Sequence, residues 1–234
     1  ASEHTLNFNE SDITVTNGAI SSFTSISGTV YTCILRPNDE LEISINANSG
    51  VFTDGVGNGN VASDQFNWIY NDTPPSMTIS AIKNDSSIVS GSITNHSVFT
   101  IVFISNEDIT NFTIDDINIS GGFLDSFSGS GKIYSANFTV NNEGEYLISV
   151  ADASFIDNAG NNNLPVVPFS WSFDKTPPTI VISVYNFNNE SIASGSTTSD
   201  DSLLLNISMS EGSINFDILD LTVTSGSISS FNGS

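Results

Sequence analysis

The sequence predicts an all-β fold, made of tandem β-sandwich repeats of 103 to 104 residues each. Three observations predict it. The chain matches itself at a steady offset, its apolar residues alternate with a period of two, and loops rich in Gly, Asn, Asp and Ser separate the alternating segments. With 38% hydrophobic residues among 234, the chain can build a core and is not a disordered tail.

The repeat emerges when the sequence is aligned with itself. A shift of 104 positions aligns residues in three copies: Glu3 with Glu107 and Glu211, Phe8 with Phe112 and Phe216, Asp12 with Asp116 and Asp220, and Gly18 with Gly122 and Gly226. After the loss of one residue before Tyr31, a shift of 103 aligns a second group: Tyr31 with Tyr134, Asp54 with Asp157, Asn58 with Asn161, and Trp68 with Trp171. We therefore expect the chain to contain more than one copy of the same structural module.

Within the middle copy, apolar residues alternate in short segments, which is typical of half-buried strands. These segments are 77–79, 99–103, 117–119, 134–140, 146–150 and 169–173, and a further short strand is expected at 123–127. About seven strands in about 100 residues, joined by turn-forming loops, indicate an immunoglobulin-like sandwich. A single helical turn is expected within 111–116.

The two proline pairs mark the junctions between sandwiches, because proline cannot donate a hydrogen bond to a sheet. Residues 76–178 then form one complete domain, 1–75 a domain without its first strands, and 179–234 a domain without its later strands. Half a sandwich exposes its core face to water. We therefore expect this sequence to be part of a longer tandem array, or to borrow strands from neighbouring copies. A head-to-tail exchange is disfavoured, since both partial domains contain the equivalent of roughly 105–130.

The charge excludes several classes of partner. The chain has 26 acidic and 4 basic residues, giving a net charge of −22, although only 13% of its residues are charged. Such a surface repels phosphate backbones and anionic lipid, so no nucleic-acid or membrane-surface binding is expected. The segment contains no apolar run of about 18 residues, so no membrane insertion is expected in it.

Three sequences, FTIDDINISGG at 112–122, FIDNAGN at 155–161 and FSWSFDKTPP at 169–178, resemble the bacterial Ig-like repeat family. The resemblance covers essentially the whole chain. Repeats of this family occur in tandem in large surface adhesins, surface-layer proteins and biofilm proteins, so the resemblance implies an Ig-like fold and an extracellular, cell-surface location. It does not imply one function, because such repeats serve as spacers, adhesive modules and assembly units.

Two equivalent loops carry regularly spaced oxygen ligands: Asp54, Asn58 and Asn60, and Asp157, Asn161 and Asn163. Such a loop can curl around a hard cation at about 2.4 Å, which predicts calcium. Calcium sites near domain junctions are also implied by the family resemblance, with Glu3, Glu107, Asp72 and Asp174 completing them. The alternative is a Gly/Asn turn whose side chains cap their own backbone.

Ten Asn-x-Ser/Thr sequences are candidate glycosylation sites, since exposed copies are modified in a glycosylating secretory pathway. They begin at Asn9, Asn71, Asn84, Asn95, Asn111, Asn118, Asn137, Asn189, Asn206 and Asn232.

The residues give little support to catalysis. His4 and His96 are the two histidines, and neither lies in a catalytic motif. Cys33 alternates with apolar strand neighbours, which predicts a small core residue rather than a nucleophile. Trp68 and Trp171 are interpreted as core residues rather than sugar-binding platforms, because they alternate in phase with apolar neighbours.

We therefore predict a non-enzymatic extracellular structural protein, whose tandem repeats form part of a cell-surface filament, layer or stalk. Its partners would be further copies or repeats of the same protein, with glycans as a second class. Polymerisation has to overcome the charge of −22 through salt, bound cations or glycans. The alternatives are the spacer of a large adhesin and the accessory domains of a secreted hydrolase.

Overall fold

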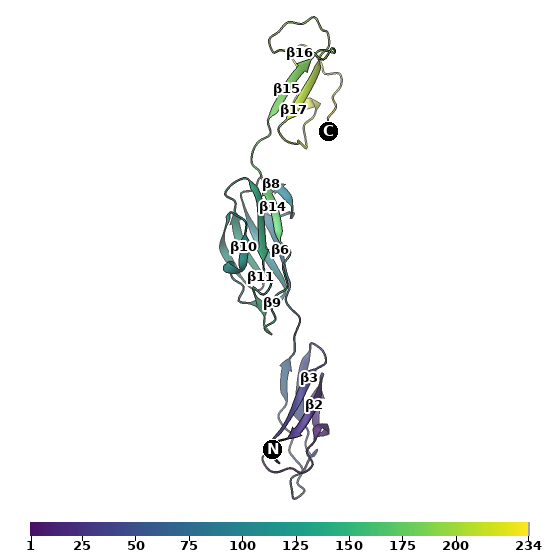
Figure 1. Ribbon diagram of the computed structural model, residues 1–234, viewed down its shortest axis with the longest axis vertical. Helices are drawn as coiled ribbons and strands as arrows, with labels where there is room; N and C mark the ends of the chain where they lie inside the picture. Colours follow the sequence, from purple (N-terminus) through teal and green to yellow (C-terminus); the bar gives the residue numbers. More distant parts are fainter. Residues whose placement is uncertain (234) are drawn as a thin grey trace. The chain divides into compact units, whose positions relative to one another are not determined.

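The computed structural model describes residues 1–233 and consists of strands, loops and three short 3-10 turns (Figure 1). It divides into two compact units, Ala1–Asp174 and Lys175–Ser234. We call residues 1–75 the first repeat, 76–178 the middle repeat and 179–234 the last segment. The predicted all-β fold is confirmed.

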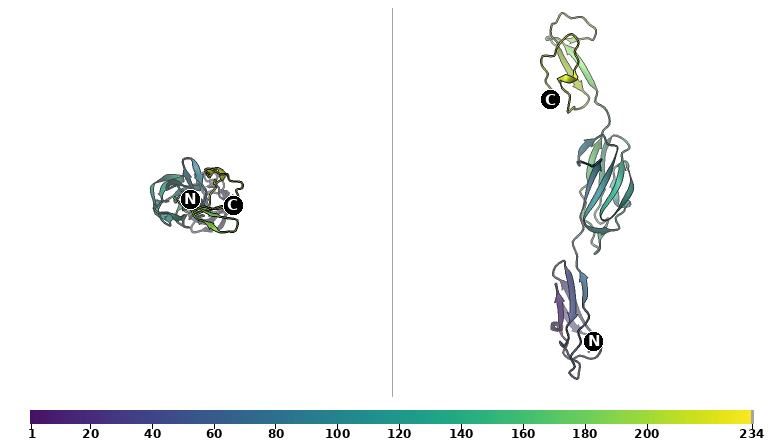
Figure 2. Two further views of the ribbon diagram at one scale, coloured as in Figure 1. Left: turned by 90° about the horizontal axis from the view of Figure 1, so that it is seen from above. Right: turned by 180° about the vertical axis from the view of Figure 1, so that it is seen from behind.

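The middle repeat is a complete sandwich of two sheets (Figure 2). One sheet has the order β11-β9-β6-β7, with β13 pairing to β9: β6 (Met77–Lys83), β7 (Ser86–Ile88), β9 (Val98–Thr110), β11 (Phe123–Thr139) and β13 (Ile156–Asp157). The other has the order β10-β12-β14-β8: β8 (Ser92–Thr94), β10 (Ile117–Ile119), β12 (Gly144–Val150) and β14 (Phe169–Phe173). All pairs are antiparallel except β14 with β8.

The core of this sandwich is aromatic. Trp171 on β14 is 2% exposed, and its ring meets Phe138 at a centroid distance of 4.8 Å and Phe99 at 5.0 Å, both edge-on. Its ring also stacks on Tyr146 at 5.3 Å. The indole N–H has no hydrogen-bond partner among the described residues. The interpretation of Trp171 as a core residue is therefore confirmed.

The first repeat has the later strands of the same sandwich. Its sheets are β1-β4-β5 and β2-β3: β1 (Ile13–Thr16), β2 (Gly18–Ser25), β3 (Tyr31–Pro37), β4 (Glu42–Ala47) and β5 (Phe66–Ile69). The pairing of Ile43 with Trp68 repeats that of Tyr146 with Trp171. Within residues 1–75, as described, no strand takes the place of β6, β7 or β8. Cys33 and Trp68 are therefore half-buried rather than fully enclosed as predicted.

The last segment has the early strands. β15 (Ile180–Tyr185) pairs with β16 (Ser191–Ile192) on one side and β17 (Leu204–Met209) on the other. Ile182 lies opposite Ile207, as Ile79 lies opposite Phe103 between β6 and β9. The pairing of β15 with β17 therefore has the same register as the pairing of β6 with β9.

A capping motif explains the aspartates that recur every 104 positions. Each ends a 3-10 turn: η1 (Glu10–Asp12), η2 (Ile114–Asp116) and η3 (Ile218–Asp220). The Oδ2 atom of Asp116 accepts a hydrogen bond from the backbone N–H of Thr113 at 2.7 Å, and Asp12 and Asp220 make the equivalent bond. The helical turn predicted within 111–116 is confirmed as η2.

Candidate functional site

The loop after β13 is organised by Asp157, whose side chain is buried. Its Oδ1 atom accepts hydrogen bonds from the backbone N–H groups of Ala159 and Asn161, each at 2.8 Å. Its Oδ2 atom accepts one from the side-chain amide of Asn161 at 2.9 Å. Gly160 has a φ of +96°, a conformation that favours glycine, so the loop can turn tightly. This is the geometry of the turn alternative.

The hydrogen bonds also set the charge of Asp157. Burial raises the pKa of this carboxyl, but the bonds from the Asn161 side chain and backbone and from neighbouring backbone N–H groups outweigh it. The net pKa is lower than the ordinary value, so the ionised form is the one that the fold stabilises.

Asn71 connects this loop to the end of the first repeat. Its side-chain amide donates to Asp157 Oδ2 at 3.1 Å and to Glu107 Oε2 at 3.4 Å. In return, the side-chain amide of Asn161 donates to the backbone carbonyl of Asn71 at 3.1 Å. The amide of Asn71 thus lies between two carboxylates.

The next two linker residues, Asp72 and Thr73, are hydrogen bonded to the first repeat. Glu40, in the loop after β3, accepts hydrogen bonds from the backbone N–H of Asp72 at 2.8 Å and from the Thr73 hydroxyl at 2.7 Å. Asp72 accepts a hydrogen bond from the Tyr70 hydroxyl at 2.7 Å, which lowers the pKa of Asp72. Asp72 therefore lies with Glu40, whereas Asn71 contacts the Asp157 loop. At the equivalent position after β14, the backbone N–H of Asp174 donates to the carbonyl of Thr94 at 3.1 Å.

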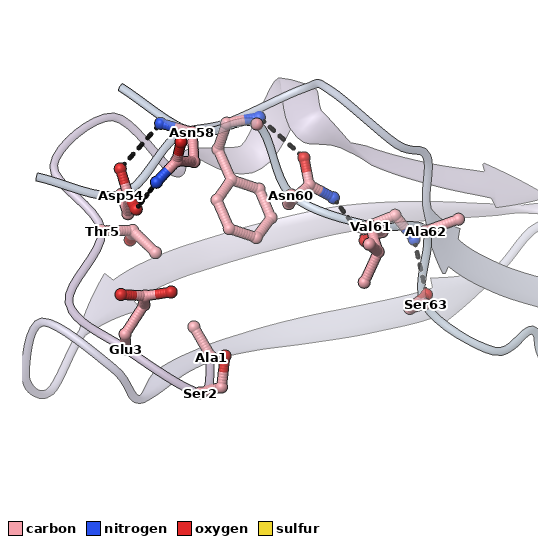
Figure 3. A pocket seen from close by; sticks show the side chains of 13 residues that line it. Ala1, Ser2, Glu3, Thr5, Asp54, Asn58, Asn60, Val61, Ala62 and Ser63 are labelled. Carbon is pink, nitrogen blue, oxygen red and sulfur yellow. Dashed lines mark hydrogen bonds between the residues drawn. The ribbon is translucent and has the colours of Figure 1, made fainter. Parts of the chain in front are cut away.

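The first repeat contains the same loop. Asp54 Oδ1 accepts from the backbone N–H groups of Val56 at 2.9 Å and Asn58 at 2.8 Å, and Oδ2 accepts from the Asn58 side chain at 2.7 Å. The Asn58 bonds lower the pKa of Asp54. Glu3 and Asp54 border one pocket together with Thr5 and Phe52 (Figure 3). Because Glu3 and Asp54 correspond to Glu107 and Asp157, this pocket corresponds to the place that Asn71 takes in the middle repeat.

The side chains of Asn60 and Asn163 hydrogen bond to backbone groups rather than to each other or to a shared site. The Oδ1 atom of Asn163 accepts from the N–H groups of Ser154 and Phe155, and its amide donates to two backbone carbonyls. Asn60 makes the four equivalent bonds. Both lone pairs of each amide oxygen are thereby used. In the part of the chain that the structure describes, no group of three His, Cys, Asp or Glu side chains is placed to hold a metal.

Comparison with protein families agrees with this architecture. A family model described as the bacterial Ig-like domain matches residues 1–70 and again residues 71–168. The chain belongs to the bacterial Ig-like domain family. The second match begins at Asn71, whose side chain is hydrogen bonded to the Asp157 loop. Searches of curated proteins and of solved structures give no match.

Membership confirms the family resemblance and the fold class. Bacterial Ig-like domains are common as repeats of extracellular surface proteins and are typically non-catalytic. The boundaries 1–75, 76–178 and 179–234 stay predictions. Among residues 1–233, no helix is both long and apolar enough to cross a bilayer.

The candidate glycosylation sites differ in access. Nine of the ten asparagines are exposed, whereas Asn71 is half-buried and hydrogen bonded to Glu107 and Asp157. A glycan on Asn71 would break this contact. The third residue of the site at Asn232, Ser234, lies outside the described residues.

Two residues that organise the Ig-like repeats are not predicted by the sequence as members of the site. Asn71 is a candidate for glycosylation alone, and Glu40 belongs to no predicted motif. Both positions nevertheless carry a signal in the repeat alignment. A shift of 103 aligns Asn71 with the polar residue Asp174, and it aligns Glu40 with Glu143. A search for every recurring polar position would therefore have found them.

Proposed function

We propose that this chain is a non-enzymatic structural segment of an extracellular surface protein, whose Ig-like repeats span distance within a filament, layer or stalk. The linker supports the proposal most directly. Residues 71–73 bond backward to Glu40 and forward to Glu107, Asp157 and Asn161. Further forward bonds join Pro75 to Leu164 and Ser76 to Asn106. A linker hydrogen bonded on both sides transmits force better than a free one.

Antibodies to the middle repeat test this role on intact and permeabilised cells. We expect equal labelling of both, with gold particles along filaments, layers or stalks in electron micrographs. Labelling that requires permeabilisation would contradict the proposal. Isolated rods tipped by a different domain would support the adhesin-spacer alternative, and co-purification of a catalytic domain on the same polypeptide the hydrolase alternative.

Calcium is a second part of the proposal, and the two loops fit it unequally. In the middle repeat, four N–H donors already engage Asp157, so the residues present do not fit a cation without loss of the Asn71 contact. In the first repeat, Glu3 and Asp54 border one pocket, and the three N–H donors that engage Asp54 all come from its own loop. These two carboxylates would hold calcium there.

Calorimetric titration with calcium chloride after chelator treatment tests this part. We expect a binding heat that is lost in Asp54→Asn and kept in Asp125→Asn, an exposed carboxylate on β11. A rise in melting temperature should accompany the heat. Absence of both heat and melting shift in the unsubstituted chain would refute calcium binding.

A further inference from the structure

We propose that the outer side of one sheet of the middle repeat packs against the same side of a second copy of this chain, so that copies associate laterally. This inference rests on the proposed structural function and names the surface that joins its copies. The sheet has the order β11-β9-β6-β7. We call its side that points away from the aromatic core the outer face.

Alternation along the strands identifies the residues of the outer face. On β9, Phe99, Ile101 and Phe103 are buried in the core, so the residues between them point outward. The pairing of β9 with β11 and β6 aligns the outward residues of these strands in rows. The outer face consists of Thr78, Ser80, Ile82, Ser87, Val98, Thr100, Val102, Ile104, Ile133, Ser135, Asn137 and Thr139.

Aliphatic side chains give the outer face its apolar character. Ile104 on β9 lies opposite Ile133 on β11, and the two side chains are 43% and 58% exposed. Val98 and Ile82 are 40% and 39% exposed, and Val102 is half-buried. These side chains lie on the solvent side of a sandwich whose two sheets are both formed. Their exposure is therefore a property of the closed repeat.

Several hydroxyl groups of the outer face are hydrogen bonded within the sheet. The Thr78 and Ser80 hydroxyls each donate to a backbone carbonyl of β9 at 3.4 Å. The Thr100 hydroxyl donates to the side-chain oxygen of Asn137 on the neighbouring strand at 3.3 Å. Because these donors already have partners, covering the face does not leave them unsatisfied. The outer face therefore loses its water at a lower cost than its Ser and Thr content suggests.

Charge selects a second copy as the partner. The chain has a net charge of −22, yet no residue of the outer face is charged. Two copies can therefore meet there without bringing carboxylates into the centre of the contact. The outer side of the opposite sheet differs, because Glu145 on β12 lies there, opposite Ser172 on β14. Two copies that met through that side would oppose like charges.

The rim of the outer face carries charges of both signs. Asp125 corresponds to Ser21, which pairs with Ile34 in the first repeat, so Asp125 lies beside Asn137 at one end of the face. Lys132 directly precedes the outward residues of β11 at the other end. These two charges balance, so the rim does not add to the repulsion between copies.

The area indicates a weak contact. Strands about 4.8 Å apart, with residues that advance about 3.3 Å each, give the outer face roughly 400–500 Å² on each copy. Two copies then bury roughly 800–1,000 Å², less than the 1,200 Å² or so of the smallest stable complexes. A single pair of repeats therefore associates weakly. Several repeats in register along two chains would bind more tightly, because each contact raises the effective concentration for the next.

The candidate glycosylation site at Asn137 lies on the outer face, beside Thr100. A glycan at this position would stand between the two copies. We therefore expect Asn137 to be unmodified in assembled material, which peptide mass mapping measures. A glycan on Asn137 in assembled filaments or layers would overturn the proposal.

Two substitutions at positions of nearly equal exposure separate the outer face from the opposite side of the sandwich. Ile104→Glu places a carboxylate on the outer face, where the native side chain is 43% exposed. Leu147→Glu, the matched control, places one on the outer side of β12, where the native side chain is 41% exposed. Ile133→Glu is a second variant of the outer face. All three change the net charge equally, and their melting temperatures check that they fold.

Sedimentation equilibrium of residues 1–234 measures the association. It is run in about 1 M NaCl, where the Debye length is about 3 Å and the net charge is screened. We expect Ile104→Glu and Ile133→Glu each to raise the dissociation constant about tenfold or more, because each places an unpaired carboxylate inside the contact. Leu147→Glu should leave the dissociation constant within about twofold of the unsubstituted value, because its carboxylate stays in water.

Three results would overturn the proposal: weakening by Leu147→Glu as large as that by Ile104→Glu, association that no variant changes, and a chain that is monomeric at every concentration tested. Each of these results leaves the structural role intact, because that role is tested by surface labelling. Association that depends on the outer face, found without surface labelling, would instead support the inference and refute the surface role.

Discussion

Among single residues, Asp157 makes the hydrogen bonds that hold both its own loop and the linker before β6. In Asp157→Asn, the new side-chain amide would face the donor amides of Asn161 and Asn71. Because a donor would then face donors, we expect the middle repeat to lose about 1–3 kcal/mol of unfolding free energy. Urea denaturation measures this loss, with the exposed Asp125→Asn as control. An equal loss in both variants would contradict the assignment.

The lowered pKa of Asp157 predicts a pH dependence. Because the pKa is lower in the folded state than in the unfolded chain, the contribution to stability is complete above the unfolded value of about 3.9 and is lost as the pH falls through the folded value. The difference in unfolding free energy between wild type and Asp157→Asn should therefore be constant from about pH 7 to pH 5 and shrink below about pH 4. A difference that grows in acid would refute the assignment.

Sequence reasoning found Asp157 and Asp54 because their loops recur at a fixed offset. It could not choose between a turn and a cation loop, because both need oxygen-bearing side chains and glycine. Asn71 lies 86 positions before Asp157, so the sequence alone does not show that their side chains are hydrogen bonded in the folded chain.

Among the elements, equivalent strands differ in what covers them. Phe169→Ala should destabilise the middle repeat by about 3–5 kcal/mol, because the ring is buried. Phe66→Ala should cost residues 1–234 less than about 1 kcal/mol of unfolding free energy, because that ring is largely exposed. Thermal or urea unfolding compares the two variants, and similar losses would show that β5 is covered after all.

In the middle repeat, alternation predicted the long strands and the short strand β10 (Ile117–Ile119), but it missed three other short strands. β9, β11, β12 and β14 each contain a predicted segment, because one face of each strand is buried. β7, β8 and β13 have two or three residues each and give no periodic signal. Their positions depend on pairing with β6, β14 and β9, which the sequence of a short strand does not encode.

For the whole molecule, the net charge of −22 opposes the close approach of copies at low salt. If copies associate within a filament or layer, screening of this charge should favour the association. We therefore expect self-association to strengthen as NaCl rises from about 0.05 M to about 1 M, which light scattering measures. Weakening over that range would contradict a self-association that the net charge opposes.

The central claim is that the closed Ig-like sandwich of the middle repeat bears load along the chain. Single-molecule pulling from the two ends of residues 1–234 tests it most directly. We predict one dominant unfolding step, with a gain in length of roughly 300 Å from the strands between Met77 and Phe173. Three steps of equal length, or extension without a distinct step, would contradict the account.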